Sequence, residues 1–509
     1  MKNEMNRYKA TLMIAAGLLA ASACSCSCSK DNGEKSGIKP VDGARYTVYM
    51  DGTLQTVHEC RVSAVPFNRS WPGHQRTLDQ TETAYFVNCE MPDAAKPVTF
   101  EIACSRNLNE VIVRPAELGI EVKAAKGVIS FVVSHPCQFS VCVNGRRGAL
   151  HVFVNGPEPY SVDKDDPGVI YFGPGEHEAG LIVPKTGQTV YLHKDAWVKG
   201  QIFVKDASNV KVLGRGVLDS SPYSRGYREG ENSGYSTAVA KALTNYISAS
   251  ETQYIGNICF WNCHDVTVEG PVFVDSPFWS FITRNGCSDF SIKNIKIVGQ
   301  WRYNSDGVDF CTTSHVTMSD SFIRSFDDAI VVRPPHLSGE STGGASSDIS
   351  VQNCVVWDDW GKAMEIYISK GAGTISDVHF KDIYISYIDY AAIDIYSKYS
   401  GDETVSGSVV KNISYSGIHI DNDGTYYVRQ AQTSDDQVFN YYAPGSPVHY
   451  TFIINGSFPT GTPSGIKVSY DDIRIDNISC NGNALSYILQ PAPGYLTVSN
   501  VYLDGQKLL

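Results

Sequence analysis

The sequence predicts an all-β protein in which a small antiparallel β-sandwich precedes a right-handed parallel β-helix. Two observations carry this prediction. Apolar and polar residues alternate over the first part of the chain, and a short motif recurs from about residue 169 onward without a helical period of 3.6 residues. We expect four parts, which are an export signal over 1–24, a flexible tether over 25–44, the sandwich over 45–157 and the β-helix over 160–509.

The composition describes a folded, acidic protein. The 509 residues include 42 Lys and Arg against 54 Asp and Glu, giving a net charge of −12, and 42% of the residues are hydrophobic. Single compact cores stop growing near about 250–300 residues, so this length favours two domains or an elongated repeat. Because duplex binding needs Lys and Arg to neutralise phosphates, nucleic acid is an unfavourable partner, and a polyanionic substrate is mildly disfavoured.

The start of the chain predicts export and lipidation. Basic residues precede an apolar run from Ala10 to Ala23, which is too short to span a bilayer as a mature helix. The run ends in small residues before Cys24, as in the bacterial lipoprotein signal whose cysteine is lipidated after cleavage. Cys26 and Cys28 are alternatives for the lipid. We therefore expect a membrane partner through an N-terminal lipid anchor, at the outer membrane or cell surface of a Gram-negative bacterium.

The cysteines do not predict a disulfide framework. Fourteen are present, and the three in the leader leave eleven, an odd number at irregular spacing in a chain large enough to form a core. We expect buried free thiols. Cys263, Cys287 and Cys311 follow one another at equal intervals, which predicts an internal stack of thiols on successive coils of a solenoid.

Half-buried strands are predicted between about Arg45 and Pro157. Apolar residues alternate with polar ones there, for example at Val98, Phe100 and Ile102. Asp51-Gly52 and Asn144-Gly145 separate such runs and tolerate the positive φ of a tight hairpin turn. A segment of this length and pattern is typical of an antiparallel β-sandwich.

The recurring motif predicts the β-helix. It consists of a small or polar residue, then Asn, Asp or His, then alternating aliphatic and polar residues, and its copies begin at Ser208, His264, Ser288, Ser314, Ser347, Ser376 and Lys411. A period in the twenties is typical of a solenoid, whose coils stack about 4.8 Å apart. Interruptions at 334–346 and about 421–465 predict long surface loops, and aromatic residues in the second either stack on sugars or hold the loop in place.

Two acidic motifs are the candidate site. Asn304-Ser305-Asp306-Gly307 and Asp327-Asp328 are one coil apart, so Asp306 and Asp327 should lie on neighbouring coils with Asp328 displaced to the side. Like charges at such distances repel, so at least one carboxyl keeps its proton near neutral pH. An inverting glycosidase needs one protonated carboxyl and one carboxylate, about 6.5–9.5 Å apart.

Two other interpretations of these aspartates remain open. Asp and Asn often satisfy backbone amides at turns, and we expect this role for Asp265, Asp289, Asp309 and Asp348. Clustered carboxylates also bind Ca²⁺.

The two acidic motifs resemble the signature of the solenoid glycoside hydrolases, which include the polygalacturonases of family 28 and the dextranases and isopullulanases of family 49. The resemblance covers most of the chain from about residue 165. It implies that Asp327 is the general acid, that Asp306 and Asp328 hold the attacking water, and that no cofactor is needed.

The chain departs from the polygalacturonases in ways that favour family 49. It lacks their Gly-His-Gly and Arg-Ile-Lys motifs, and in these places it has Trp360–Glu365 and Ala392–Tyr396. The acidic Glu365 and Asp394 would repel galacturonate, an effect that Lys362 partly offsets, and dextranase-type enzymes also carry an N-terminal sandwich. We therefore expect a neutral α-glucan of the dextran or pullulan kind as the polysaccharide partner.

The remaining candidates are substrate-binding residues near the acidic motifs. They are Asn304, Trp301, Tyr303, Lys362, Glu365, Asp394 and Tyr396. The aromatic ones stack on sugars or belong to the core, and Arg302 and Arg324 either neutralise carboxylates or bind substrate. Three alternatives to the neutral-glucan hydrolase stay open, namely a pectin hydrolase, a Ca²⁺-dependent pectate-lyase-like enzyme and a non-catalytic surface glycan-binding protein.

Overall fold

The computed structural model describes most of the chain. The described residues are 38, 40–64, 78, 81–223, 255–334, 344–368, 373–388, 391–397, 407–421, 450–454, 468–481, 486–489 and 494–508. The expected export signal with Cys24, and most of the two expected surface loops, lie outside them. No helix among these residues is long and apolar enough to cross a membrane.

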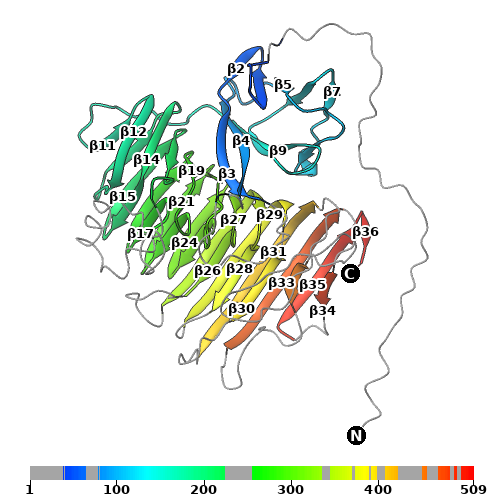
Figure 1. Cartoon of the computed structure of the whole chain (residues 1–509). Coiled ribbons are helices and arrows are strands. Elements are labelled where there is room, and N and C mark those ends of the chain that lie inside the picture. The colour runs from blue at the N-terminus through cyan, green and yellow to red at the C-terminus, as the bar shows by residue number, and fades with distance from the viewer. Residues whose placement is uncertain are drawn as a thin grey trace.

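Two five-stranded sheets form the N-terminal part, shown in blue and cyan in Figure 1. One sheet has the order β2 (Thr53–Gln55), β1 (Tyr46–Met50), β5 (Val98–Cys104), β8 (Val128–Val133), β7 (Lys123–Ala125). The other has the order β3 (His58–Ser63), β4 (Thr81–Glu90), β10 (Leu150–Asn155), β9 (Cys137–Val143), β6 (Val111–Arg114). A 3-10 turn, η2 (Ala116–Leu118), follows β6.

The sandwich is not purely antiparallel. Strands β4 and β10 pair in parallel, with Leu150 opposite Tyr85, whereas the other pairings in both sheets are antiparallel. Strands of the other sheet lie between β4 and β10 in the chain, so no tight turn imposes the antiparallel order.

The second part is a parallel β-helix, as the repeat predicts, and the all-β fold class is confirmed. Its strands are β11 (Val169–Phe172), β12 (Gly175–Ile182), β13 (Thr189–Leu192), β14 (Ala196–Lys205), β15 (Ser208–Gly214), β16 (Val217–Asp219), β17 (Ile258–Trp261), β18 (His264–Glu269), β19 (Val272–Val274), β20 (Phe281–Arg284), β21 (Cys287–Lys293), β22 (Lys296–Val298), β23 (Val308–Cys311), β24 (Thr313–Ser319), β25 (Phe322–Ser325), β26 (Ile330–Arg333), β27 (Ala345–Asp358), β28 (Lys362–Ile368), β29 (Thr374–Tyr387), β30 (Ala391–Ser397), β31 (Ser408–Asp421), β32 (Tyr450–Ile454), β33 (Val468–Asn481), β34 (Ser486–Leu489), β35 (Leu496–Leu503) and β36 (Gln506–Lys507). Corresponding strands of successive coils lie side by side from green to red in Figure 1.

The second residue of the repeat has a left-handed backbone, which explains its identity. Its φ lies between 51° and 60° at Asn209, Asp265, Asp289, His315, Asp348, Asp377 and Asn412. Asn, Asp and His tolerate this conformation better than most L-residues. The aliphatic residues that follow, such as Val266 and Val268, fill the core. Asp265, Asp289 and Asp348 therefore take this left-handed bend within β18, β21 and β27, whereas Asp309 in β23 does not, so the expected turn role is wrong for Asp309.

The described cysteines are all free, and all but Cys137 are buried. Cys263 and Cys287 lie on neighbouring coils, where the Cys263 N–H donates to the Cys287 sulfur at 3.4 Å. The predicted stack of three is wrong, because Cys287 pairs in register with Thr313 and not with Cys311. Cys311 instead packs in a separate apolar cluster that includes Trp261 and Trp279.

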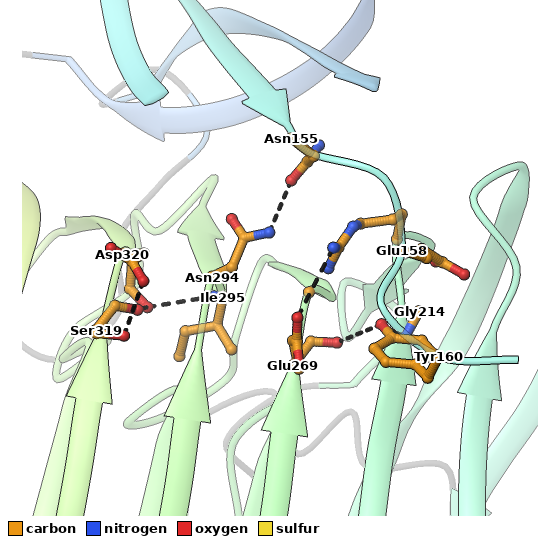
Figure 2. Close-up of polar contacts among 12 residues, drawn as sticks. Asn155, Glu158, Tyr160, Gly214, Glu269, Asn294, Ile295, Ser319 and Asp320 are labelled. Carbon is orange, nitrogen blue, oxygen red and sulfur yellow. Dashed lines mark hydrogen bonds and ion pairs between the residues drawn. The ribbon is translucent and has the colours of Figure 1, made fainter. Parts of the chain in front are cut away.

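The sandwich contacts the β-helix through a mixed polar and apolar interface. Figure 2 shows the Asn155 side chain at the end of β10 accepting a hydrogen bond from Asn294 at 2.9 Å. The buried Lys296 ammonium donates to the same Asn155 oxygen at 2.5 Å. Phe153 of the sandwich packs beside Phe322 of the helix, with ring centroids 5.0 Å apart. The sandwich therefore lies against the coils that carry the acidic motifs.

Candidate active site

The two acidic motifs occupy corresponding turns on neighbouring coils. The first precedes β23 and the second precedes β26, and the Gly307 N–H donates to the Asp328 carbonyl at 2.9 Å. The strands that follow the two turns pair Val308 with Ile330. Carried back into the turn, this register brings Asp306 level with Asp328. The expected partnership of Asp306 with Asp327 is therefore off by one position.

The glycine of the first motif has a steric cause. A β-carbon at Gly307 would lie 2.3 Å from the Ala329 carbonyl oxygen and 2.5 Å from a methyl group of Ile323. No larger residue fits there without moving the next coil. The motif glycine thus lets the two acidic turns approach closely.

Arg333 neutralises one side of the acidic patch. Its guanidinium lies 2.6 Å from a carboxylate oxygen of Asp309 and 3.6 Å from one of Asp306, and it covers the Trp279 ring at 4.1 Å from the centroid. Burial, followed by the charges of nearby aspartates, raises the pKa of Asp306 well above its usual value. Burial also raises the pKa of Asp309 to about 7, against the opposing effect of Arg333. These two carboxyls therefore retain protons more readily than exposed aspartates.

Lys362 gathers three acidic groups on the other side. Its ammonium lies 2.7 Å from Glu365, 3.4 Å from Asp328 and 3.9 Å from Asp394. Burial alone would raise the pKa of Asp328, but Lys362, a hydrogen bond from Glu365 and Arg333 together bring it below its usual value. Burial and then the Asp328 charge raise the pKa of Glu365 well above normal. Asp328 therefore favours its charged form, whereas Asp306 and Glu365 keep protons more readily than exposed carboxyls do.

Asn304 orients Asp327. The Asn304 side-chain amide donates to one Asp327 carboxylate oxygen at 3.4 Å, and the Asp328 N–H donates to the other at 3.1 Å. Asn304 has a φ of 53°, a conformation that asparagine tolerates. The asparagine of the motif therefore shapes the turn and contacts a candidate acid.

Two of the predicted aromatic residues, Trp301 and Tyr303, have described surroundings. Trp301 is 8% exposed, and its indole N–H donates to Asp275 at 2.8 Å. Tyr303 packs at the edge of an apolar cluster that includes Phe326 and Trp360. Tyr396 pairs in register with Tyr367, and its side chain lies outside the described part. Substrate binding by these three residues remains a prediction.

Both flanking arginines pair with carboxylates. Arg302 lies 3.0 Å from Asp275, and Arg324 lies 3.0 Å from Asp359. Arg333 and Asp309 are site residues that sequence reasoning missed. The sequence could have indicated them, because both lie on strands that directly follow the acidic turns and alternate there with core residues such as Phe310.

No three or more His, Cys, Asp or Glu side chains among the described residues are arranged to hold a metal ion.

Comparisons with known proteins agree with the acidic motifs. Residues 198–433 match the model of the family described as Glycosyl hydrolases family 28. The chain resembles the β-helical glycoside hydrolases. No curated protein matches it in a sequence search.

Solved structures resemble the chain to different degrees. Dex49A from Penicillium minioluteum is 15% identical, with 95% of this chain and 94% of that chain covered and a TM-score of 0.56. A family 28 exopolygalacturonase from Yersinia enterocolitica is 12% identical, with 82% and 98% covered and a TM-score of 0.38. The match to Dex49A spans both the sandwich and the β-helix, in keeping with the predicted likeness to family 49.

Proposed function

We propose that the protein is an inverting glycoside hydrolase that cleaves O-glycosidic bonds of a neutral extracellular polysaccharide, an α-glucan of the dextran or pullulan kind. One observation carries the proposal. Asp306, Asp327 and Asp328 meet on adjacent coils in a nearly buried patch, where the pKa of Asp328 is lowered and that of Asp306 is raised.

In the proposed reaction, Asp327 acts as the general acid and gives its proton to the leaving glycosidic oxygen. Water held between Asp306 and Asp328 attacks the anomeric carbon from the opposite face, and Asp328 accepts its proton. One carbon–oxygen bond forms as the other breaks, so the anomeric configuration inverts. The low pKa of Asp328 supports its role as the base.

The charge balance supports a neutral substrate. Arg333 and Lys362 together face five carboxyl groups, which are Asp306, Asp309, Asp328, Glu365 and Asp394. Both cations are thus already matched by acidic groups, and a uronate carboxylate would meet repulsion. A neutral sugar avoids that cost.

A pectin hydrolase is the second candidate. The match of residues 198–433 to the family 28 model favours it. It predicts cleavage of polygalacturonate, which the charge argument disfavours.

Product analysis separates the candidates. Reducing-sugar release and product size would be measured on dextran, pullulan and polygalacturonate, for the native protein and for Asp327→Asn, with folding of both checked by circular dichroism. We expect release from a neutral glucan that Asp327→Asn abolishes. Polygalacturonate cleavage alone would overturn the substrate assignment, and ultraviolet-absorbing products lost with chelator would indicate a lyase. Binding without cleavage, equal in both proteins, would indicate a glycan-binding protein.

We also propose export and attachment to the membrane through a lipid on Cys24. The leader sequence and the cysteine after its small residues support this. Labelled palmitate should enter the membrane-bound protein, and Cys24→Ser should abolish both label and membrane association. Loss of label in Cys26→Ser or Cys28→Ser instead would move the assignment to that cysteine.

A further inference from the structure

We propose that Lys362, Glu365 and Asp394 form a buried proton-sharing unit that positions Asp328 and keeps it ionised, and that they are not ligands for the substrate. This inference rests on the proposed hydrolase function. It assigns to the three residues a role different from the sugar binding expected from the sequence.

The strands place these groups in a row beside the catalytic turn. Glu365 of β28 is in register with Asp394 of β30 on one side and with Val331 of β26 on the other. Glu365 alternates with the core residues Met364 and Ile366, so it points outward from the β-helix core. Glu365 is nevertheless only 1% exposed and Asp394 only 2%. Both side chains lie against the Lys362 ammonium, so their described contacts are with another protein group.

The contacts favour a shared proton. The Lys362 ammonium lies 3.4 Å from Asp328, 2.7 Å from Glu365 and 3.9 Å from Asp394, so three buried carboxyl groups surround one cation and at least one of them tends to keep a proton. Asp328 already accepts the Lys362 backbone N–H at 3.1 Å and faces the Lys362 ammonium at 3.4 Å. The ammonium also lies 2.7 Å from Glu365, but Asp328 has a backbone N–H in addition, and burial and the Asp328 charge raise the pKa of Glu365, so we place the proton on Glu365.

Lys362 holds the unit together. An ammonium group has three N–H donors, and three carboxyl groups lie within 3.9 Å of this one. Its charge offsets the ionised Asp328 and lets Asp394 lie close to Glu365. Without it, the most favourable adjustment is protonation of Asp328, which would remove the base.

Other charged or titratable groups face this unit and remain in every variant below. They are Asp306, Asp309, Asp327, Arg333 and Tyr415. The aspartates oppose ionisation of Asp328, whereas Arg333 favours it. A shift in the pH profile of a Lys362 or Glu365 variant is therefore measured while these neighbouring charged groups stay the same.

The first test is the pH profile of Lys362→Met on the glycan that the native protein cleaves. Loss of the cation makes Asp328 harder to ionise, so the acidic limb of kcat moves to higher pH. We expect kcat at acidic pH to fall about tenfold or more with little change in KM. Lys362→Arg keeps a cation at this place, so its acidic limb should lie nearer the native pH. An increase in KM with an unchanged limb would overturn the proposal in favour of substrate binding.

Glu365 provides a second test if Lys362→Met does not fold. Glu365→Gln keeps an N–H donor for Asp328, whereas Glu365→Leu removes it. We expect the acidic limb of Glu365→Gln to stay near the native position and that of Glu365→Leu to move to higher pH. Equal limbs in these two variants would contradict the proposal.

Lys199→Met is the matched control. Lys199 pairs with Glu178 at 2.9 Å and Glu176 at 3.3 Å, on strands far along the helix from the acidic turns. Its pH profile should equal that of the native protein. Failure of the native protein to cleave any glycan would instead refute the proposed function, a result distinct from unchanged profiles in an active native enzyme.

Discussion

Gly361 lies directly against the backbone of Asp328. A β-carbon at Gly361 would come within 2.5 Å of the Asp328 nitrogen and 2.6 Å of the Asp327 carbonyl carbon. The Asp358 carboxylate accepts hydrogen bonds from the N–H groups of Trp360 and Gly361, which fixes this turn. Gly361, on the coil of β28, therefore supports the peptide bond between Asp327 and Asp328.

Gly361→Ala should impair catalysis more than stability. The added methyl group must displace the Asp327–Asp328 peptide, and a shift near 1 Å is expected to lower kcat about 10²-fold. The free energy of unfolding should fall by about 1–3 kcal/mol, as for other overpacked sites. Glucan hydrolysis and thermal unfolding measure the two effects. Gly494→Ala is the control, because a β-carbon there meets nothing within 4 Å; equal kcat in the two variants would contradict the argument.

Arg324→Met should strongly destabilise the protein. Arg324 is buried, pairs with Asp359 at 3.0 Å and donates to the ring of His151 in the sandwich at 3.1 Å. Its removal leaves the Asp359 charge buried without this partner, which should lower the free energy of unfolding by about 3–5 kcal/mol. Arg474→Met, which breaks an exposed pair with Asp472, should cost under about 1 kcal/mol. Chemical denaturation of both variants measures the loss of unfolding free energy. Similar losses in the two variants would show that the Arg324–Asp359 pair stabilises the protein no more than an exposed pair does.

Glu117 should make the stability of the native protein depend on pH. Burial, and then the charge of Asp421 in β31, raise the pKa of Glu117 from 4.5 to about 7. A raised pKa means that the folded state holds the proton more tightly, so this stabilisation is complete below pH 4.5 and is lost as the pH rises through about 7. Relative to Glu117→Gln, the native Tm should therefore fall over this interval. A constant difference in Tm from pH 4 to 8 would refute the assignment.

The stereochemistry of the first product tests the proposed mechanism. Single displacement by water at an α-linked glucan should release the β-anomer first, which then mutarotates. Proton NMR of the anomeric signals during the first minutes of hydrolysis distinguishes the outcomes. Initial release of the α-anomer would show retention, with a covalent intermediate, and would exclude water held by Asp306 and Asp328 as the first attacking group.

The sequence was most informative where a local rule decides the outcome. Left-handed bends accept few residue types, so Asp289 and His315 marked successive coils, and alternating aliphatic residues marked the core. The spacing of Asp306 and Asp327 was enough to predict two acidic turns on neighbouring coils. These features depend on backbone geometry within a short stretch of chain, which the amino-acid order alone records.

The tertiary structure decided what depends on register and on distance through space. Cys287 pairs in register with Thr313 of the next coil, so Cys311 does not join the thiol stack. The pairing of Val308 with Ile330 brings Asp306 level with Asp328. Likewise, the Lys362 ammonium of β28 meets the Asp394 carboxylate of β30, on the next coil. The loops make the coils differ in length, so residue spacing alone does not give the register. Charged groups on different coils interact through space, and no short stretch of sequence records this. The ionisation of the site therefore follows from how the coils stack.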